Sequence, residues 1–514
     1  MDSKKRFDES LAGRDGYVKK ESAMEEAFLE NDILSLLTKS NILNGDKRPV
    51  LITSFIPLQH IHFAAELEIV ERLIAKGYSV YVLRCHSHLN SCFANPTHLR
   101  SLCTACKSTF SRSYKLIQNE RLTIIDFPGE DDLETVTMVT LSERSSHHRE
   151  IVRGAYSSAV SYSKDPKITK LKDHKVLERN LKSADYVFDS LNRLIHLHDF
   201  SSVVVFNGRF SESKSVIEAC RLNNVPVFCH EISGSALSYR LFEGGDTHSL
   251  NFHKGCISNY LEKLEKDKDV LIKGAEFFEK QRDGKAFSSL RRNFFVEGQT
   301  RKHLPKFFDR GRKNIAVFIS SEDEFAAYEE WANPYNASQF EALCVALPLL
   351  VALDFVIWIR LHPHLKGRHD NSQVSEMRSL KRDNVHIIEP DDEVDSYALI
   401  ENCQNVITFG STIGLESAYM GVNTILLGRA IYEDTGINRV PVSIYDLSSS
   451  LDLPIDEKVR EKCLVVGAYL ASEYNAFRHT EFSPNQKYLL YRNHRLLPRF
   501  FARTLYHLFL SLGK

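Results

Sequence analysis

The chain has 514 residues, with 66 basic and 67 acidic side chains and a formal net charge of −1 at pH 7. This length is enough for two or three domains with substantial hydrophobic cores. Because the net charge is close to zero, the chain lacks the global positive potential of a nucleic-acid-binding protein, and we do not expect nucleic acid as a partner.

Residues 1–45 form a polar, charged extension with a short helix predicted near residues 25–37. The opening MDSKKRFDES has no apolar segment, so it reads as neither a secretory signal nor a transit peptide and predicts a cytoplasmic protein. The longest apolar run, residues 342–359, is interrupted by Pro348 and Asp354. We interpret this run as a buried helix followed by a strand rather than as a membrane span.

A first βαβ unit follows the extension. Residues 49–55 predict a strand, residues 63–75 an amphipathic helix, and residues 78–84 a second strand. The loop after the first strand contains His60 and His62. A histidine with a pKa near 6.5 takes a proton from a hydroxyl group at neutral pH, so either residue is a candidate catalytic base, although most loop histidines are inert.

A cluster of cysteines follows this unit. Four of the ten cysteines, Cys85, Cys92, Cys103 and Cys106, lie within residues 85–106. Because disulfides are rare in the cytosol, the cluster predicts one structural metal, zinc, held by four thiolates. The spacing matches no common zinc finger, and cysteine is also a good small core residue, so ordinary packing is the alternative.

Two later strands of the N-terminal half end in polar residues. Residues 202–206 predict a strand that ends in Asn207-Gly208-Arg209, after a mostly helical segment over residues 145–200. The strand near residues 228–231 ends in Glu231. Glu231 is a candidate general base, or alternatively the partner of a surface ion pair.

A second lobe is predicted to begin after the charged, helical residues 257–312. Residues 314–320 predict its first strand, and the segment IWIRLHP predicts a later one that ends in Arg360 and His362. The carboxyl ends of strands in open α/β sheets converge on the ligand crevice, so these two side chains are candidate binding groups.

The most informative stretch is residues 405–428, which predict a strand, a polar turn, a helix and another strand. The turn places Ser411, Thr412 and free backbone N–H groups at a helix N-terminus, whose partial positive charge attracts phosphate. Glu416 lies about one helical turn further on, where a carboxylate accepts hydrogen bonds from ribose hydroxyls. The alternative is that Ser411 or Thr412 only caps the helix.

Common nucleotide-binding motifs are missing from the sequence. Neither G-x-G-x-x-G nor G-x-x-x-x-G-K-[ST] occurs between a predicted strand and a predicted helix, and there is no H-E-x-x-H. These observations disfavour a dinucleotide-dependent oxidoreductase, a P-loop NTPase and a zinc metalloprotease.

The order RLHPH, DSYALI and FGSTIGLESAYMG, over roughly residues 312–430, resembles the C-terminal half of bacterial capsule and surface-polysaccharide biosynthesis glycosyltransferases of the GT-B fold. Similar motifs occur in Kdo transferases, bacterial sialyltransferases and teichoic-acid polyol-phosphate polymerases. The loop of His60 and His62 resembles the loop that carries a catalytic histidine in many GT-B enzymes. Ile232-Ser233 departs from the Arg-Gly expected after Glu231.

The resemblance implies an α/β protein with two Rossmann-like lobes that face across a cleft, with helical insertions and a C-terminal helix. We expect residues 46–311 to form the acceptor lobe and residues 312–480 the nucleotide-sugar lobe. The candidate catalytic residues are His60, His62, Glu231 and His362. The candidate donor-binding residues are Arg360, His362, Gly410, Ser411, Thr412, Gly414 and Glu416.

The implied reaction transfers a sugar from a nucleotide-activated donor, with a CMP-sugar such as CMP-Kdo favoured, to a growing capsule or surface polysaccharide. The acceptor would be a glycan or a lipid-linked glycan, and the implied geometry requires no catalytic cofactor. The alternatives are polyol-phosphate transfer or UDP-sugar epimerisation by the same fold, and a non-catalytic scaffold of a polysaccharide assembly complex.

Residues 481–514 are predicted to form a basic amphipathic helix in which arginines interleave with leucines and aromatic residues. Over residues 487–514 this helix would contact the inner face of the plasma membrane, where lipid-linked acceptors reside. The alternative is a helix packed back across the lobes.

Overall fold

The computed structural model describes residues 48–496, apart from 128–140, 284–301 and the short gaps 235–236, 245–246, 265–266, 327, 337, 369–370, 473 and 486–487. The predicted extension over residues 1–45 and the last residues of the predicted C-terminal helix therefore lie outside the described residues. Within the described part, no helix is long and apolar enough to cross a membrane.

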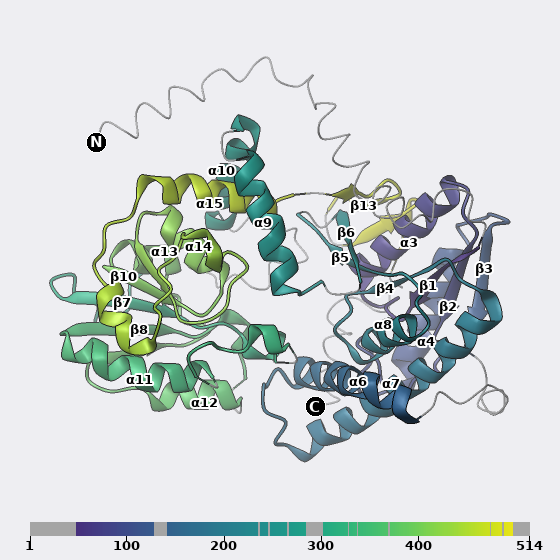
Figure 1. Ribbon diagram of the computed structural model, residues 1–514, viewed down its shortest axis with the longest axis horizontal. Coiled ribbons are helices and arrows are strands. Elements are labelled where there is room, and N and C mark those ends of the chain that lie inside the picture. Colours follow the sequence, from purple (N-terminus) through teal and green to yellow (C-terminus); the bar gives the residue numbers. More distant parts are fainter. Residues whose placement is uncertain are drawn as a thin grey trace. The chain divides into compact units, whose positions relative to one another are not determined.

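The first lobe is built on a seven-stranded sheet with the order β12-β6-β5-β4-β1-β2-β3 (Figure 1). Five of its strands run parallel: β1 (Val50–Ser54), β2 (Val80–Arg84), β3 (Leu122–Asp126), β4 (Ser202–Phe206) and β5 (Val227–Ile232). Two antiparallel strands extend the edge: β6 (Ser238–Glu243) and β12 (Asn475–Ala476). Strands β1 and β4 are buried throughout, because helices cover both faces of a parallel sheet.

The helices of the first lobe include a long pair in the segment between β3 and β4 that was predicted to be mostly helical. They are α3 (His60–Ala75), α4 (Arg100–Tyr114), α6 (Leu141–Ser163), α7 (Leu171–His198) and α8 (Ser211–Leu222). Leu51 and Val203 of the sheet share one hydrophobic core with Val187 of α7 and Val216 of α8. Gly77 ends the first βαβ helix with a positive φ of 92°, a conformation that glycine adopts without steric cost.

The second lobe is built on a five-stranded, fully parallel sheet with the order β11-β10-β7-β8-β9. Its strands are β7 (Lys313–Phe318), β8 (Phe355–Arg360), β9 (Val385–Ile388), β10 (Asn405–Thr408) and β11 (Asn423–Leu426). Helices α11 (Gln339–Ala352) and α12 (Ser372–Ser379) cover one face, and α13 (Ser396–Glu401) and α14 (Thr412–Tyr419) cover the other (Figure 1).

The two parallel sheets share one strand order, in which the first strand of each lobe is central and flanked by its second and fourth. This is the doubly wound arrangement, whose switch point lies between the first and fourth strands. The prediction of an α/β protein with two Rossmann-like lobes is therefore confirmed.

Four helices share one hydrophobic core. Helices α9 (Leu250–Leu264) and α10 (Lys268–Arg282) lie in the segment predicted to belong to the first lobe. Their residues Ile257 and Phe278 pack with Leu415 of α14 and Cys463 of α15 (Glu457–Leu470) in the second lobe. The amphipathic pattern indicated helices, but it does not say which lobe an apolar face covers.

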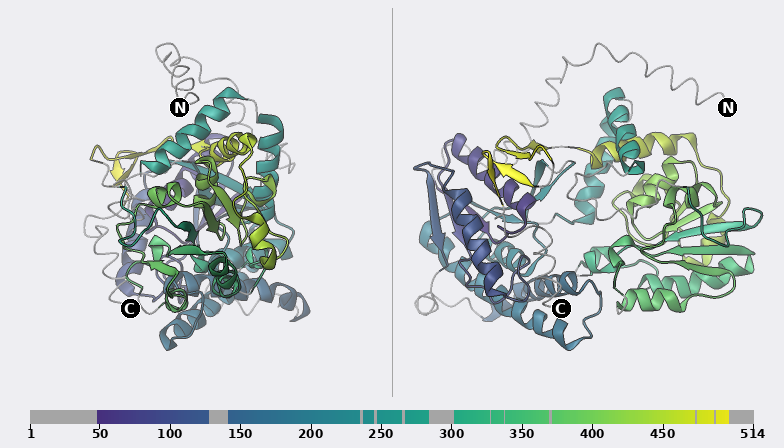
Figure 2. Two further views of the ribbon diagram at one scale, coloured as in Figure 1. Left: turned by 90° about the vertical axis from the view of Figure 1, so that its left-hand side faces the viewer. Right: turned by 180° about the vertical axis from the view of Figure 1, so that it is seen from behind.

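After α15 the chain returns to the first lobe, where β13 (Thr480–Phe482), β14 (Leu489–Tyr491) and β15 (His494–Arg495) form a small antiparallel sheet beside α3 (Figure 2). The Glu71 carboxylate of α3 accepts hydrogen bonds from the hydroxyl of Tyr491 and from Nε and Nη2 of Arg492. The structure thus differs from the predicted helix over residues 487–514, because residues 489–491 and 494–495 form strands.

Candidate active site

The first group of polar residues lies at the switch point of the first lobe. His62 is in the first turn of α3, which follows β1; Asn207 follows β4; and Glu231 is near the end of β5. Because β1, β4 and β5 are parallel neighbours, their carboxyl ends lie at the same edge of the sheet. Three residues that are distant in the sequence are thereby brought together.

The predicted loop with two histidines is the start of a helix. Helix α3 begins at His60, so His60 and His62 project from its first turn. Two positions in an α-helix are separated by about 200° around the helix axis, so the two side chains point in nearly opposite directions. The structure places His62 beside Glu231.

His62 and Glu231 form a close pair. Nδ1 of His62 lies 3.1 Å from Oε1 of Glu231, although the ring is not turned for a linear hydrogen bond. Nδ2 of Asn207 donates to Oε2 of Glu231 at 2.6 Å, and the backbone N–H of Ile232 donates to Oε1. Burial opposes ionisation, but His62, Asn207 and Ile232 together hold the pKa of Glu231 well below its usual range. Glu231 is therefore a carboxylate at neutral pH.

Two further histidines flank this pair: His230, which precedes Glu231 in a segment that resembles the capsule group, and His248, which was not singled out from the sequence. Nε2 of His248 lies 3.3 Å from Nδ2 of Asn207, and burial lowers the pKa of His248 to about 3. His230 is 1% exposed, and burial lowers its pKa to about 3 as well. Both rings are therefore neutral at pH 7. No sequence signal marks His248, which follows the antiparallel strand β6.

The second group of polar residues surrounds the polar turn after β10. Ser411 is the N-cap residue of α14, and its hydroxyl accepts a hydrogen bond from the backbone N–H of Ile413 at 3.4 Å. Gly410 has a φ of 112°, and a Cβ at this position would lie 2.0 Å from the carbonyl oxygen of Arg429. Only glycine fits there, so the turn is held against the loop after β11.

Arg360 ends β8 and is almost completely buried. Its exposed fraction is 2%, and Nη2 donates to the carbonyl oxygen of Asp392 at 3.3 Å. Nε and Nη1 have no hydrogen-bond partner among the described residues. Burial lowers the pKa of Arg360 to about 10, partly offset by Asp392 and Asp395, so the guanidinium remains charged. His362 follows in the loop after β8, where it is partly exposed.

Glu416 lies inside the second lobe rather than at its surface. It is 5% exposed and accepts hydrogen bonds from the hydroxyls of Tyr397 and Thr412. Burial raises the pKa of Glu416 above its usual range. Thr412 itself is exposed, so Glu416 positions a hydroxyl at the N-terminus of α14.

Unpaired polar groups lie against the first turn of α14. A Cβ added to Gly414 would contact Thr408, Tyr432 and Asn438 within 3.0 Å, which shows how closely these three side chains surround the turn. The Oγ1 of Thr408 and both polar side-chain atoms of Asn438 are buried without a partner in the described structure. Buried polar groups are usually hydrogen-bonded, so these atoms are candidates for ligand contacts. Asn438 was not among the predicted residues.

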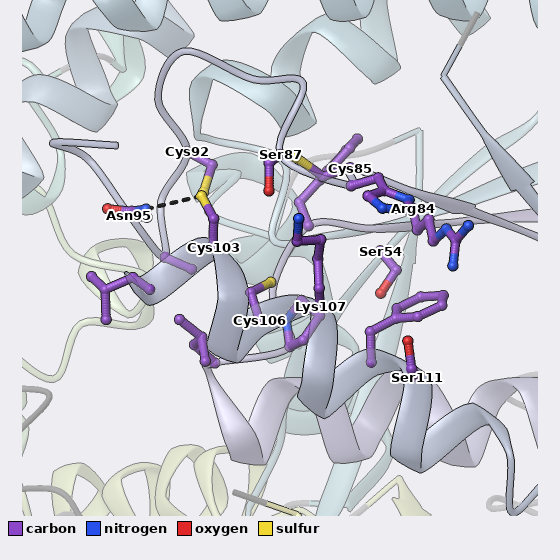
Figure 3. Close-up of a pocket in the computed structure, with 17 residues that line it drawn as sticks. Ser54, Arg84, Cys85, Ser87, Cys92, Asn95, Cys103, Cys106, Lys107 and Ser111 are labelled. Carbon is purple, nitrogen blue, oxygen red and sulfur yellow. Dashed lines mark hydrogen bonds between the residues drawn. The ribbon is translucent and has the colours of Figure 1, made fainter. Parts of the chain in front are cut away.

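The four clustered cysteines line one cavity of about 80 Å³ in the first lobe (Figure 3). None of the four forms a disulfide, and burial raises the thiol pKa values of Cys85, Cys92 and Cys106. Across the described residues, no group of three or more His, Cys, Asp or Glu side chains is arranged to hold a metal ion. The four cysteines therefore border one cavity, but the described side chains are not arranged to hold a single metal ion.

The fold and the positions of the two polar groups define the class of protein. Two doubly wound lobes, each with polar side chains at the carboxyl ends of its central strands, are the GT-B architecture. Residues 351–441 match the family model described as capsule polysaccharide biosynthesis protein. The predicted relationship is confirmed over this segment, which contains Arg360, His362 and the turn from Gly410 to Thr412.

Several solved structures are similar to this chain. KpsC beta Kdo 2,7 transferase from Thermosulfurimonas dismutans is 16% identical with a TM-score of 0.35, covering 63% of this chain and 90% of that chain. A putative UDP-N-acetylglucosamine 2-epimerase from Listeria monocytogenes is 13% identical with a TM-score of 0.26, covering 84% and 93%. Sucrose-phosphate synthase from Thermosynechococcus elongatus is 10% identical with a TM-score of 0.30, covering 82% and 93%.

The activities named for these proteins differ, so they do not assign a substrate to this chain. No curated protein sequence matches it significantly.

Proposed function

We propose that the protein is a glycosyltransferase that moves a sugar from a nucleotide-activated donor to a growing capsule or surface polysaccharide. The observation that carries the proposal is the His62–Glu231 pair at the switch point of the first lobe. Transfer to a hydroxyl group requires that the hydroxyl lose its proton, and an oriented histidine is the usual acceptor of that proton.

In this proposal His62 is the general base. Nδ1 of His62 faces the Glu231 carboxylate, which leaves Nε2 as the nitrogen that accepts the proton of the acceptor hydroxyl. The ionised Glu231 orients the ring and stabilises the imidazolium that forms, as the carboxylate does in a Ser-His-Asp triad. Asn207 in turn holds Glu231 in place through its 2.6 Å hydrogen bond.

The second lobe would bind the donor. The N-terminus of α14, with the hydroxyls of Ser411 and Thr412, would stabilise the phosphate that departs as the glycosidic bond breaks. Arg360 and His362 would add charge and a further hydrogen bond. Contact between Glu416 and a ribose hydroxyl would require the carboxylate to exchange its hydrogen bond from Tyr397.

The finer assignments rest on the resemblance found in the sequence. A CMP-sugar such as CMP-Kdo is the donor we favour, and a glycan or lipid-linked glycan at the cytoplasmic face of the membrane is the expected acceptor. We propose no catalytic metal. Peripheral membrane contact through residues 487–514 would bring the enzyme to a lipid-linked acceptor, with the strands up to residue 495 anchored on the first lobe.

The test is a panel of CMP-, UDP-, GDP- and CDP-linked compounds, each assayed for donor hydrolysis and for transfer to capsule oligosaccharides. The proposal predicts release of nucleotide and a new glycosidic bond with one sugar donor, CMP-linked in the favoured case. Turnover of a CDP-polyol would show polyol-phosphate transfer, and isomerisation of a UDP-sugar without transfer would show an epimerase. No turnover with any compound would favour the scaffold.

A further inference from the structure

The cavity lined by the four cysteines is separate from both polar groups described above. Cys85 follows β2, Cys92 lies in the loop before α4, and Cys103 and Cys106 lie on α4. The last two are three positions apart, so they project from the same side of the helix. Figure 3 shows the four side chains around the same space, with Asn95 and Lys107 beside them.

Backbone N–H groups beside the cavity point toward the sulfur of Cys85. The backbone N–H groups of Ser87 and Leu89 donate to the Cys85 sulfur, and that of His88, which also contacts the sulfur, donates to the Cys85 carbonyl oxygen at 3.0 Å. His86 and Ser87 have positive φ values of 47° and 75°, an uncommon backbone conformation for residues other than glycine. Successive N–H groups that converge in this way form a concavity for anions, which is a recurrent feature of iron–sulfur sites.

A second sulfur is also hydrogen-bonded. Nδ2 of Asn95 donates to Sγ of Cys103 at 3.3 Å, while Oδ1 of the same side chain accepts from the backbone N–H of Leu99. The asparagine is 4% exposed, so its orientation is fixed by these contacts. A neutral thiol is a weak hydrogen-bond acceptor, whereas a metal-bound thiolate is a strong one.

The charges around the cavity also suit an anionic group. Its lining includes Arg84, His86 and Lys107 but no aspartate or glutamate. Arg84 and His86 contact Asp126, which lies outside the lining, so Lys107 is the cation most available to the four sulfurs. Four thiolates would be strongly repulsive here without a bound cationic centre.

A single metal ion does not account for the four cysteines. In a tetrahedral zinc site the Zn–S distance is about 2.3 Å, which holds the four sulfurs about 3.8 Å apart. The described cysteines are not arranged in this way, yet all four border the same cavity. A polynuclear core holds its thiolate ligands farther apart than a single ion does, because several metal and sulfide atoms lie between them.

We propose that Cys85, Cys92, Cys103 and Cys106 bind an iron–sulfur cluster. On binding, the four thiols lose their protons and each sulfur ligates one iron. The cluster would stabilise the loop between β1 and α3, because Pro57 and Leu58 of that loop line the cavity and the loop leads directly to His62. We assign it a structural role and no redox step in sugar transfer.

The test uses the full chain purified without oxygen. Iron, acid-labile sulfide and zinc are measured per chain, together with visible absorption and electron paramagnetic resonance after reduction. The proposal predicts iron and sulfide in equal amounts, close to the stoichiometry of one cluster per chain, and the absorption of a cysteine-ligated cluster. If the chain is purified without iron, the same signals should appear after anaerobic incubation with ferrous and ferric iron and sulfide.

Variants Cys103→Ala and Cys106→Ala should lose most of the iron and sulfide. The matched control is Cys344→Ala, an exposed cysteine of α11, which should retain them. Stoichiometric zinc without sulfide would overturn the proposal, as would failure of the folded parent chain to take up iron and sulfide. The parent measurement decides the question even if the α4 variants fail to fold, and it does not depend on transferase activity.

Discussion

The two lobes have the same strand order but different chemistry at their switch points. In the first lobe, the polar side chains are already paired: His62 with Glu231, and Glu231 with Asn207. In the second lobe, Arg360 and Asn438 are buried with unpaired polar atoms among the described residues. The same fold, present twice in this chain, thus carries a paired histidine and carboxylate in one copy and unpaired hydrogen-bonding groups in the other.

This difference suggests that the first lobe provides the general base and the second lobe binds the donor. A general base must be oriented before the substrate arrives, and neighbouring side chains provide that orientation. A binding site for a charged ligand instead leaves donors unpaired until the ligand supplies acceptors, at a cost in stability. The comparison predicts that substitutions in the first lobe change the rate of transfer and that substitutions in the second change donor affinity.

The largest expected effect comes from the base. His62→Asn should lower kcat for transfer by about 10²- to 10⁴-fold, because general base catalysis contributes that much. Steady-state kinetics with saturating donor measures it. The matched control is His174→Asn, an exposed histidine of α7, which should leave kcat unchanged. A His62 variant with parental kcat would remove the acid–base assignment from the first lobe.

The next largest effects belong to the donor site. Ser411→Ala, Thr412→Ala, His362→Ala and Arg360→Lys should each weaken donor binding by about tenfold to a hundredfold, since a hydrogen bond to a charged group contributes about 1.5–3 kcal/mol. Arg360→Lys keeps the charge but removes the planar fork of donors. Loss of a helix cap alone would cost about 1 kcal/mol of stability without a change in affinity. Melting temperature and donor Kd, recorded for each variant, separate the two outcomes.

Acid should destabilise the first lobe through its buried histidines. Burial lowers the pKa of His230 to about 3, below the ordinary value of 6.5. Between these two values the unfolded chain binds a proton that the folded chain does not, so the free energy of unfolding falls as the pH falls from about 6.5 toward 3. The slope approaches about 1.4 kcal/mol per pH unit for one such group.

His230→Leu removes the titrating imidazole and its contribution to the pH dependence of stability. The leucine fills the buried site with an apolar side chain of similar size. Between pH 6 and pH 5, the variant should lose about 1 kcal/mol less stability than the parent, as measured by urea unfolding at each pH. Parallel pH profiles for the two proteins would show that His230 does not titrate on unfolding as the burial implies.

The smallest predicted effect tests the path of the chain between the lobes. Glu71 of α3 is bonded to Tyr491 and Arg492 of the C-terminal strands, and Arg492 is partly exposed. Arg492→Ala should therefore lower the free energy of unfolding by about 1 kcal/mol. The control Lys182→Ala removes an exposed ion pair with Glu178 and should cost less than half as much. Equal effects would mean that the strands contribute no more than a surface contact.

Much of the fold was predictable, because buried parallel strands are short apolar runs between turn signals. Residues 50–54, 355–360 and 405–408 are examples in which apolar runs became strands. Strands β6 and β12 were missed: β6 pairs antiparallel with its neighbours beyond the parallel part of the sheet, and β12, the edge strand, has only two residues. Helix α15 was missed as well, although its residues supply the core that holds α9 and α10.

The candidate site was less predictable than the fold. His62 and Glu231 were identified separately, but sequence spacing does not show that two residues in different βα units touch. His248 and Asn438 carry no motif, and only their burial beside Asn207 and Gly414 makes them notable. The roles of His60 and His362 stay predictions, as do those of the residues around the turn after β10.

One measurement tests the division of work between the lobes most directly: donor Kd by calorimetry for His62→Asn and Thr412→Ala, beside transfer rates for the same proteins. The account predicts that His62→Asn binds the donor as the parent does but transfers it at least a hundredfold more slowly, whereas Thr412→Ala binds it about tenfold or more weakly. Weaker donor binding by the His62 variant together with parental binding by the Thr412 variant would contradict it.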